Sequence, residues 1–307
     1  MLTEIDSRLL EKIADLTGKP VGAFNIRKDS GCEARQSTEH IEIVPQPEGK
    51  SGIIIRIKPG TKGEQCHIPV IISKTGLSEM VYNDFYIGED CDVDIVAGCG
   101  IHNEGSETSK HDGVHTFYVG ENSKVHYVEK HYGEGEGTGE RIMNPQTIVY
   151  LEKGASIQLD TTQLRGVDST RRYTKVVVKE DAEGFINEKL LTHGKQKAES
   201  EMDVILAGPN AKGRVVSRSV AQDESQQIFY PRMIGDAAGF GHVQCDSILM
   251  GNSKIQSIPA ITANHPDAQL IHEAAIGRIA GDQILKLMTL GLTEEEAEEE
   301  ILRGFLG

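Results

Sequence analysis

The chain has no tryptophan, few other aromatic residues and few cysteines. Aromatic residues make up 5% of its 307 residues, and only five cysteines are spread along it. An odd number of widely spaced cysteines is not typical of a disulfide framework, so we expect free thiols and a reducing, cytoplasmic location. With so few aromatic side chains, the core has to be built from Val, Ile, Leu and Ala.

Positive charge and long apolar runs are scarce as well. Lys and Arg total 32 against 47 Asp and Glu, which gives a net charge of −15. Binding to nucleic acids or to anionic membranes needs clustered positive charge, so the composition argues against both partners. Runs such as 53–55 and 70–72 are far shorter than the roughly 18 residues of a membrane span. Residues 1–10 also lack the basic and apolar regions of a secretory signal.

Glycine is abundant, and a β-rich unit recurs between residues 85 and 243. The chain contains 33 glycines. Each unit has an apolar strand, a polar turn and a second apolar strand, and the last apolar residues before the turns are Ile87, Val119, Leu151, Val178, Leu206 and Ile234. A period near 30 residues indicates units that bury their apolar faces by stacking, as in a parallel β-solenoid with glycines at its corners. An antiparallel sandwich with regular hairpins is the alternative.

Helical patterns flank this β-rich core, which we place at residues 21–262. Residues 1–20 have apolar positions three to four apart and end in Gly18 and Pro20, which predicts an N-terminal helix. Residues 263–307 predict a helical pair, with one helix over 276–290 and a second beginning in a capping box of Thr293 and Glu296. Such a pair either covers the open end of a solenoid or presents a surface to a partner.

The sequence contains no P-loop, no nucleophile elbow and no standard zinc motif. Cysteines and histidines gather in one region, where Cys99, His102, His111 and His115 have spacings that a single metal ion could use. A role of the cysteines as small buried core residues is the favoured explanation. A carbohydrate-active solenoid is disfavoured because the chain lacks tryptophan for stacking on sugars.

A second set of candidate ligands lies nearer the C-terminus. Cys245 stands in GHVQCDSILMG, and His272 and Glu273 stand in LIHEAA. Thiolate, imidazole and carboxylate groups all bind iron, and thiolate is the usual ligand of iron–sulfur clusters. A purely structural role of the same three residues is the alternative.

From Cys245 onward the sequence resembles the SufB/SufD family of iron–sulfur cluster assembly scaffolds, in a compact SufB-like form. In that family a Cys-Asp-Ser segment precedes a proline-marked turn, a His-Glu-Ala segment, an Asp-Gln pair and a final amphipathic helix. The matching positions are 245–248, Pro259, 272–274, 282–283, 291–292, Ala297, Ile301 and Phe305. The upstream segments HDGVHTFYVG and VEKHYGEG are similar as well.

The resemblance implies a right-handed parallel β-helix that acts as a non-enzymatic scaffold for a transient iron–sulfur cluster. It implies Cys245, His272 and Glu273 as cluster-binding residues. It also implies a SufC-type ABC ATPase as partner and a second β-helix, either another copy or a SufB/SufD-like chain, paired near the cluster. The terminal helices would dock the ATPase, with contacts from Ile279, Asp282, Gln283, Leu285 and Leu290.

Two alternatives stay open beside this interpretation. The chain is shorter than a full SufB and has few cysteines to relay sulfur, which is compatible with a SufD-like structural partner that binds the ATPase without holding a cluster. A β-solenoid with a mononuclear metal site is the other alternative. The presence of Cys245 together with Glu273 favours the SufB-like role.

Overall fold

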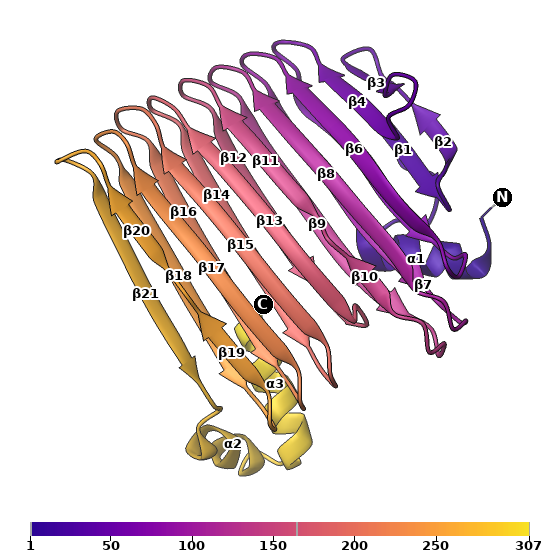
Figure 1. Cartoon of the computed structure of the whole chain (residues 1–307), viewed down its shortest axis with the longest axis vertical. Helices are drawn as coiled ribbons and strands as arrows, with labels where there is room; N and C mark the ends of the chain where they lie inside the picture. Colours follow the sequence, from indigo (N-terminus) through magenta and orange to yellow (C-terminus); the bar gives the residue numbers. More distant parts are fainter. Residues whose placement is uncertain (1, 164, 307) are drawn as a thin grey trace.

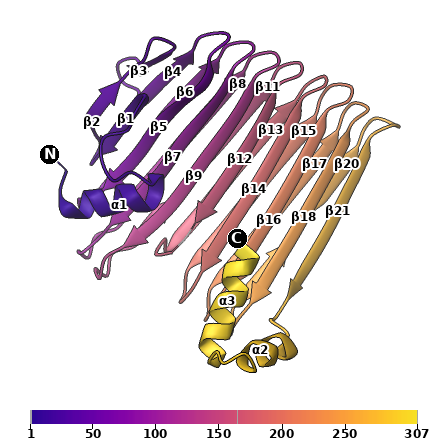
Figure 2. The same cartoon turned by 180° about the vertical axis from the view of Figure 1, so that it is seen from behind.

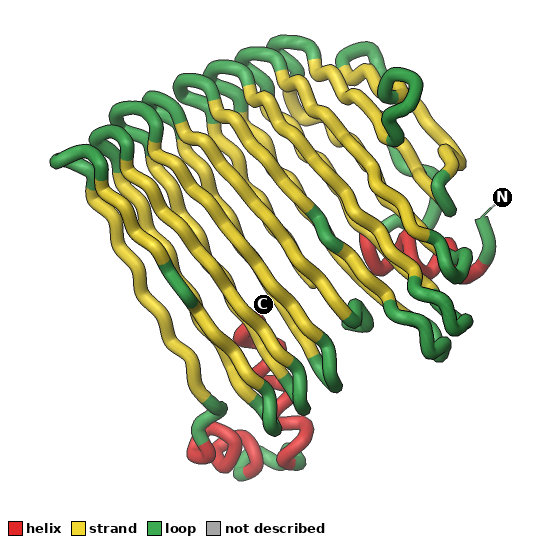
Figure 3. Tube along the Cα trace, in the orientation of Figure 1, coloured by secondary structure: helices red, strands yellow, loops and turns green. Residues whose placement is uncertain are grey.

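The structure is a computed structural model that describes residues 2–163 and 165–306. In this part of the chain, two long and mainly parallel sheets stack coil upon coil into a β-solenoid of about 8 turns (Figure 1). The parallel solenoid predicted from the repeat is confirmed. Figure 3 shows that the strands run across both faces and that the loops gather at the two long margins.

The two sheets are called sheet A and sheet B here. Sheet A contains β1 (Ala23–Lys28), β2 (Gly31–Gln36), β5 (Lys62–Ile72), β7 (Asp92–His102), β9 (Lys124–Glu134), β12 (Ser156–Gln163), β14 (Glu183–Thr192), β16 (Lys212–Ala221), β18 (Phe240–Leu249) and β21 (Gln269–Gly277). Sheet B contains β3 (Ile41–Pro45), β4 (Gly52–Ile57), β6 (Ser78–Ile87), β8 (Ser109–Val119), β10 (Arg141–Met143), β11 (Gln146–Leu151), β13 (Ser169–Val178), β15 (Lys197–Leu206), β17 (Gln226–Gly235), β19 (Lys254–Ser257) and β20 (Ala260–Ala263). Only the pairs β1–β2 and β3–β4 are antiparallel among those described.

The apolar residues that marked the repeat form one ladder inside the solenoid. Five of them lie directly on one another and are buried: Ile87, Val119, Leu151, Val178 and Leu206. Leu206 pairs next with Gly235 rather than with Ile234. The sixth marker is therefore wrong by one residue, and Ile234 belongs to the outer face of sheet B.

One turn in each of five successive coils repeats a single backbone conformation. Its central residues have φ between +55° and +68°, and they are Asp90, Asn122, Gly154, Asp181 and Asn210. The amide of each donates a hydrogen bond to a carbonyl in the next coil. Asp and Asn tolerate this left-handed region because their short side chains bond locally. The expectation that glycine supplies these corners is wrong for four of the five.

Helix α1 (Glu4–Ala14) covers the N-terminal end of the outer face of sheet A. It ends before the predicted stop at Gly18, because Asp15 adopts a left-handed conformation with φ of +53°. Two glycines of β7 make room for it. A Cβ atom at Gly98 would lie 2.5 Å from the carbonyl oxygen of Ile13, and one at Gly100 would lie 3.2 Å from Leu9. These glycines are required for close helix packing rather than for a turn.

The C-terminal segment contains a strand before its helices. β21 extends sheet A beyond residue 262, so the predicted helical segment 263–307 is helical only in α2 (Gly281–Met288) and α3 (Glu294–Leu306). The predicted capping box is confirmed, with Glu296 N donating to Thr293 Oγ1 at 3.2 Å. Figure 2 shows α3 folding back over the outer face of sheet A, as α1 does at the other end.

None of the helices in the described part of the chain has the length and apolar character that crossing a membrane requires. All five cysteines are free, as their spacing predicted.

Candidate functional site

Cys245 lies inside the solenoid, on the last strand but one of sheet A. Its side chain is 2% exposed. The Sγ atom is 3.6 Å from Nε2 of His272, and the Ser257 hydroxyl donates to the same sulfur at 3.7 Å. A thiol, an imidazole and a hydroxyl from three strands, β18, β21 and β19, therefore meet at one point.

The pairing of β21 with β18 brings His272 to Cys245 and carries Glu273 away. In this register Val243 faces His272 and Cys245 faces Ala274, so His272 is the diagonal neighbour of the thiol on the inner face. Successive residues of a strand point to opposite faces. Glu273 accordingly faces outward, where its Oε1 is 2.9 Å from Nε2 of His242. Two of the three expected ligands thus meet within one chain, and the third does not join them.

Burial sets the protonation of both inner groups. It raises the pKa of the Cys245 thiol to about 11, although the hydrogen bond from Ser257 opposes the rise. It also lowers the pKa of His272. At neutral pH the thiol holds its proton and the imidazole is neutral. Any metal ligated by the Cys245 sulfur would therefore have to displace the thiol proton, as thiolate ligation of metals generally does.

The site lies one strand from the open end of the solenoid. β21 pairs only with β18 among the described strands, and all four residues of β20 are exposed. Large apolar side chains are also exposed at this end, and they are Ile258, Ile261, Ile271 and Ile276. An unpaired strand with exposed apolar side chains is the kind of edge to which another chain can add.

A column of buried polar side chains runs through the interior beside the apolar ladder. Asn83 Nδ2 donates to His115 Nε2 at 3.1 Å, and His115 Nδ1 is 2.6 Å from the hydroxyl of Tyr127. That hydroxyl donates to Oε1 of Glu129 at 3.1 Å, and Arg172 Nη1 donates to Oε2 at 2.6 Å. The amide nitrogen of Asn83 can only donate, so Nε2 of His115 accepts. The neutral His115 ring therefore carries its proton on Nδ1 and donates it to the Tyr127 hydroxyl.

Glu129 and Arg172 form the charged centre of this column. Burial alone would raise the pKa of Glu129, but the charges of His131 and Arg172 outweigh it and hold that pKa well below its usual range. The side chain of Arg172 also lies 3.8 Å from Glu188 and 3.2 Å from Nδ1 of His131. The carboxylate of Glu129 is therefore ionised in the interior, and the guanidinium of Arg172 stabilises its negative charge.

The column ends next to Cys245. Glu188 accepts hydrogen bonds from Ser200 at 2.7 Å and from Ser217 at 2.8 Å. Ser217 stands directly between Glu188 and Cys245 in the register of sheet A. The interior of this solenoid is thus polar along one side, from β6 to the candidate site.

Glu129, Arg172 and Glu188 were not predicted from the sequence. A signal was present, because each occupies an inward position in a strand of alternating character, for example Val125, Tyr127, Glu129 and His131. Charged residues at positions that should be apolar mark a buried polar network. Which of them contact each other depends on the stacking of coils and not on the pattern.

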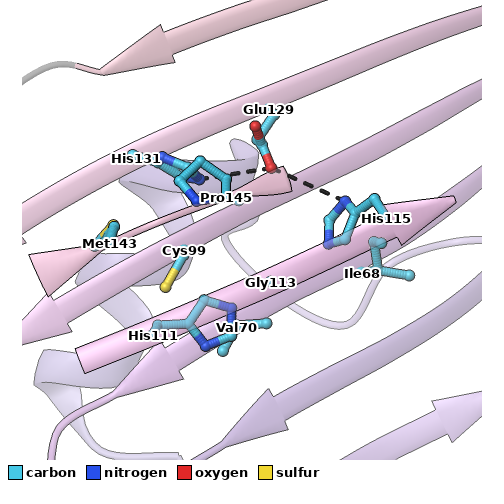
Figure 4. Close-up of a pocket in the computed structure, with 11 residues that line it drawn as sticks. Ile68, Val70, Cys99, His111, Gly113, His115, Glu129, His131, Met143 and Pro145 are labelled. Atoms are coloured by element: carbon cyan, nitrogen blue, oxygen red, sulfur yellow. Dashed lines mark ion pairs between the residues drawn. The ribbon is translucent and has the colours of Figure 1, made fainter. Parts of the chain in front are cut away.

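The proposed mononuclear metal residues are only partly brought together. Cys99, His111 and His115 line a small cavity with Glu129 and His131 (Figure 4), which encloses about 10 Å³. His102 does not line it; its two ring nitrogens are 3.2 Å from Glu134 and Glu104.

The rings that do line the cavity already have partners in the protein. His111 Nδ1 is 2.9 Å from Glu79, and both nitrogens of His115 belong to the polar column. Throughout residues 2–163 and 165–306, no group of three or more His, Cys, Asp or Glu side chains could hold a metal ion. Among these residues the four side chains of the alternative single-metal site, Cys99, His102, His111 and His115, are thus not gathered around one point, and Cys245 has one possible ligand beside it, His272.

The residues expected to contact a partner lie on or beside α2, which has no buried residue. Leu285 and Leu290 are 61% and 73% exposed, and Asp282 and Gln283 are exposed as well. Ile279 precedes the helix and is half-buried. Ile284 and Leu287 are also half-buried. α2 therefore has apolar side chains that are partly covered and others, such as Leu285, that are exposed.

Comparison with known sequences places most of the chain within one protein family. Residues 74–305 match the family described as "SUF system FeS cluster assembly, SufBD core domain". The matched region contains most of the solenoid, the Cys245 site and both C-terminal helices.

Three similar proteins carry the description iron–sulfur cluster assembly SufBD family protein. One from Archaeoglobus fulgidus is 29% identical over 277 residues, covering 89% of this chain and 72% of that protein. One from Methanocaldococcus jannaschii is 27% identical over 265 residues, covering 85% and 83%. One from Pyrococcus horikoshii is 30% identical over 210 residues, covering 64% and 60%.

Proposed function

Because the chain belongs to the SufBD family of iron–sulfur cluster assembly proteins, we propose that it is a scaffold on which such clusters are built. The cluster is the cargo of this scaffold and not a permanent cofactor. In this proposal Cys245 supplies the thiolate ligand and His272 an imidazole ligand.

The observation that carries the proposal is the 3.6 Å approach of Cys245 Sγ to His272 Nε2 near an open end. A site with four thiolates from one chain would hold its cluster tightly. One thiolate and one imidazole per chain provide too few ligands for that, which suits a cluster that must later be released.

A second chain at the open end would complete the ligand set. We propose that β21 pairs with the same edge of another copy, or of a SufB/SufD-like chain, and places two Cys245–His272 sites near one joint. A two-fold axis there would supply two thiolates and two imidazoles. Glu273 lies on the outer face of the same edge strand, where a neighbouring chain rather than its own Cys245 would be within reach.

The C-terminal helices are the proposed docking surface for a SufC-type ATPase. Their exposed leucines resemble the apolar anchors that partner helices commonly bury. ATP-driven movement of the docked ATPase would then act on α3, which rests on β16, and through it on the joint.

The test is to measure cluster binding and ATPase binding on the same purified protein. After anaerobic reconstitution with iron and sulfide, we expect the visible absorbance of an iron–sulfur cluster, and we expect the purified SufC-type ATPase to bind. ATPase binding without any cluster would select the SufD-like structural role instead. Failure of both would overturn the proposal.

The substitution Leu285→Asp is expected to weaken ATPase binding by about 30-fold, since a buried apolar anchor is worth about 2 kcal/mol. The side chain is exposed in the free protein, so the unfolding transition should not move. Calorimetric titration with the ATPase measures the effect.

Val21→Asp is the matched control, because Val21 is 90% exposed and lies two residues before β1, which is at the opposite end of the solenoid from α2 (Figure 1). Equal affinities of the two variants would place the ATPase contact away from α2.

A further inference from the structure

None of the described helices covers the outer face of sheet B. Figure 1 looks onto this face, and α1 and α3 lie behind it. Both helices contact strands of sheet A, α1 on β5, β7 and β9 and α3 on β16. An uncovered face is ordinary for a sheet when its outward side chains are polar. This face instead carries many large apolar side chains, which commonly mark an interaction surface.

Most tyrosines of the chain lie on this face. Of the eight, Tyr127 is inside the solenoid and Tyr132 packs beside α1. The others occupy outward positions of sheet B, and they are Tyr82, Tyr86, Tyr118, Tyr150, Tyr173 and Tyr230. Tyr86 and Tyr118 are 44% and 42% exposed. Tyrosine is enriched at protein interfaces, because its ring offers a large apolar surface and its hydroxyl a polar end.

One row of outward side chains is apolar along its whole length, and we call it the outer row. Its members lie directly on one another from β6 to β17, and they are Tyr86, Tyr118, Tyr150, Val177, Ile205 and Ile234. The ring centroids of Tyr86 and Tyr118 are 5.0 Å apart, and those of Tyr118 and Tyr150 are 5.5 Å apart. The outer row therefore has a stacked aromatic half and an aliphatic half of equal length.

The charges on this face balance, although the chain carries −15 overall. The outward cations of β6, β8, β11, β13, β15 and β17 are as many as the outward carboxylates. The cations are Lys110, Arg171, Lys175, Lys197 and Arg232, and the carboxylates are Asp84, Asp112, Glu199, Glu201 and Asp203. A second, equally acidic copy therefore meets less repulsion here than at a surface with the average charge of the chain.

We propose that this face binds the same face of a second copy, so that two solenoids pack sheet B against sheet B and point in opposite directions. A two-fold axis parallel to the strands produces this arrangement, because it keeps the strand direction and reverses the order of the coils. The aromatic half of each outer row then lies on the aliphatic half of the other. The facing pairs are Tyr86 with Ile234, Tyr118 with Ile205 and Tyr150 with Val177. This contact is separate from the joint at β21, which belongs to sheet A.

Charged side chains beside the outer row agree with this arrangement. The next row, two positions earlier in each strand, begins with Asp84 on β6 and ends with Arg232 on β17. Reversal of the coil order places these opposite charges across the joint, where each also keeps an ion-pair partner in its own chain. Further from the outer row Asp112 meets Glu199, but a cation of its own chain lies beside each of them.

The face is large enough for a stable contact. Its six coils from β6 to β17 span about 29 Å at a strand spacing of about 4.8 Å, and ten residues of a strand span about 33 Å. The resulting area is roughly 900 Å², whereas a standard interface takes roughly 800 Å² from each partner.

The first experiment measures mass in solution by sedimentation equilibrium over a range of protein concentrations. Tyr118→Asp with Ile205→Asp alters the outer row, and Val128→Asp with Phe185→Asp makes the same kind of change on the outer face of sheet A. Each double variant replaces one aromatic and one aliphatic outward side chain. We expect self-association to weaken at least about 100-fold in the sheet B variant only, because its carboxylates would be buried against apolar side chains.

The second experiment tests the direction of the two copies. Tyr118→Cys and Ile205→Cys are made separately in a Cys32→Ser background, since the other four cysteines are buried. A short bismaleimide should cross-link a mixture of the two variants, and neither variant alone. Cross-linking of Tyr118→Cys to itself would mean that equal coils face each other, which overturns the proposed arrangement.

The remaining outcomes also decide the proposal. An unaltered protein that does not self-associate, or equal masses of the two double variants, would overturn it. Pairing of β21 edges would raise the masses of all variants together and leave their difference unchanged. If the unaltered protein does not self-associate and the sheet B variant loses binding to the SufC-type ATPase, the face belongs to that partner and the proposal is overturned.

Discussion

Replacement of Cys245 by serine is expected to remove most of the visible absorbance gained on anaerobic reconstitution with iron and sulfide. The thiolate is the strongest iron–sulfur ligand in the site, and a serine hydroxyl at the same position is a poor ligand for soft iron–sulfide species. His272 alone cannot retain the cluster. Absorbance spectra and bound iron and sulfide per chain measure the loss.

The control is Cys66→Ser, because Cys66 is also a buried cysteine of sheet A in the same apolar core but lies on β5, six strands away from β18. Both variants bury one new hydroxyl, and each is expected to lose about 1–3 kcal/mol of unfolding free energy. Cluster loss in Cys245→Ser alone identifies a ligand. Equal retention of iron and sulfide in both variants would remove Cys245 from the ligand set and leave it as a structural thiol.

Arg172→Ala is expected to lower the free energy of unfolding by about 3–5 kcal/mol, because it leaves the buried carboxylate of Glu129 without its cation. The guanidinium is almost fully buried and holds Glu129 at 2.6 Å. The mutation also removes its contacts with His131 and Glu188. Urea unfolding followed by circular dichroism measures the change.

The neighbouring Arg171 is a matched control, since its side chain points outward, is 66% exposed and pairs with Glu201. Arg171→Ala should cost no more than about 1 kcal/mol, as exposed ion pairs do. The double variant Glu129→Gln with Arg172→Met should be more stable than Arg172→Ala, because it no longer leaves the carboxylate of Glu129 buried without its cation. Similar losses for Arg171→Ala and Arg172→Ala would show that the column is not a buried charge network.

Much of the fold could be predicted because a solenoid repeats one local rule. The ladder from Ile87 to Leu206 follows from the spacing of apolar residues, and the capping box at Thr293 follows from two residues three apart. The wrong predictions concern turns and a helix end where more than one residue type can adopt the required left-handed backbone conformation. Asp and Asn served as well as glycine at the corners, and Asp15 ended α1 before Gly18.

The candidate site was predictable only as a set of residue types. Of the three residues grouped from the sequence, Cys245 and His272 lie 3.6 Å apart in the interior. Glu273 does not join them, because adjacent strand residues face opposite sides. The polar column was missed because its members come from seven different strands, β6, β8, β9, β13, β14, β15 and β16. Their contacts depend on how the coils are stacked.

By itself, the sequence determined that this chain forms stacked β-coils and that its side chains alternate between interior and surface. Only the tertiary structure decided which residue of the His272–Glu273 pair enters the interior beside Cys245. That choice is set by the register of β21 on β18, after a connection that contains β19, β20 and the break at 258–259. A shift of one residue in that register would exchange the two faces of the strand and place Glu273 inside.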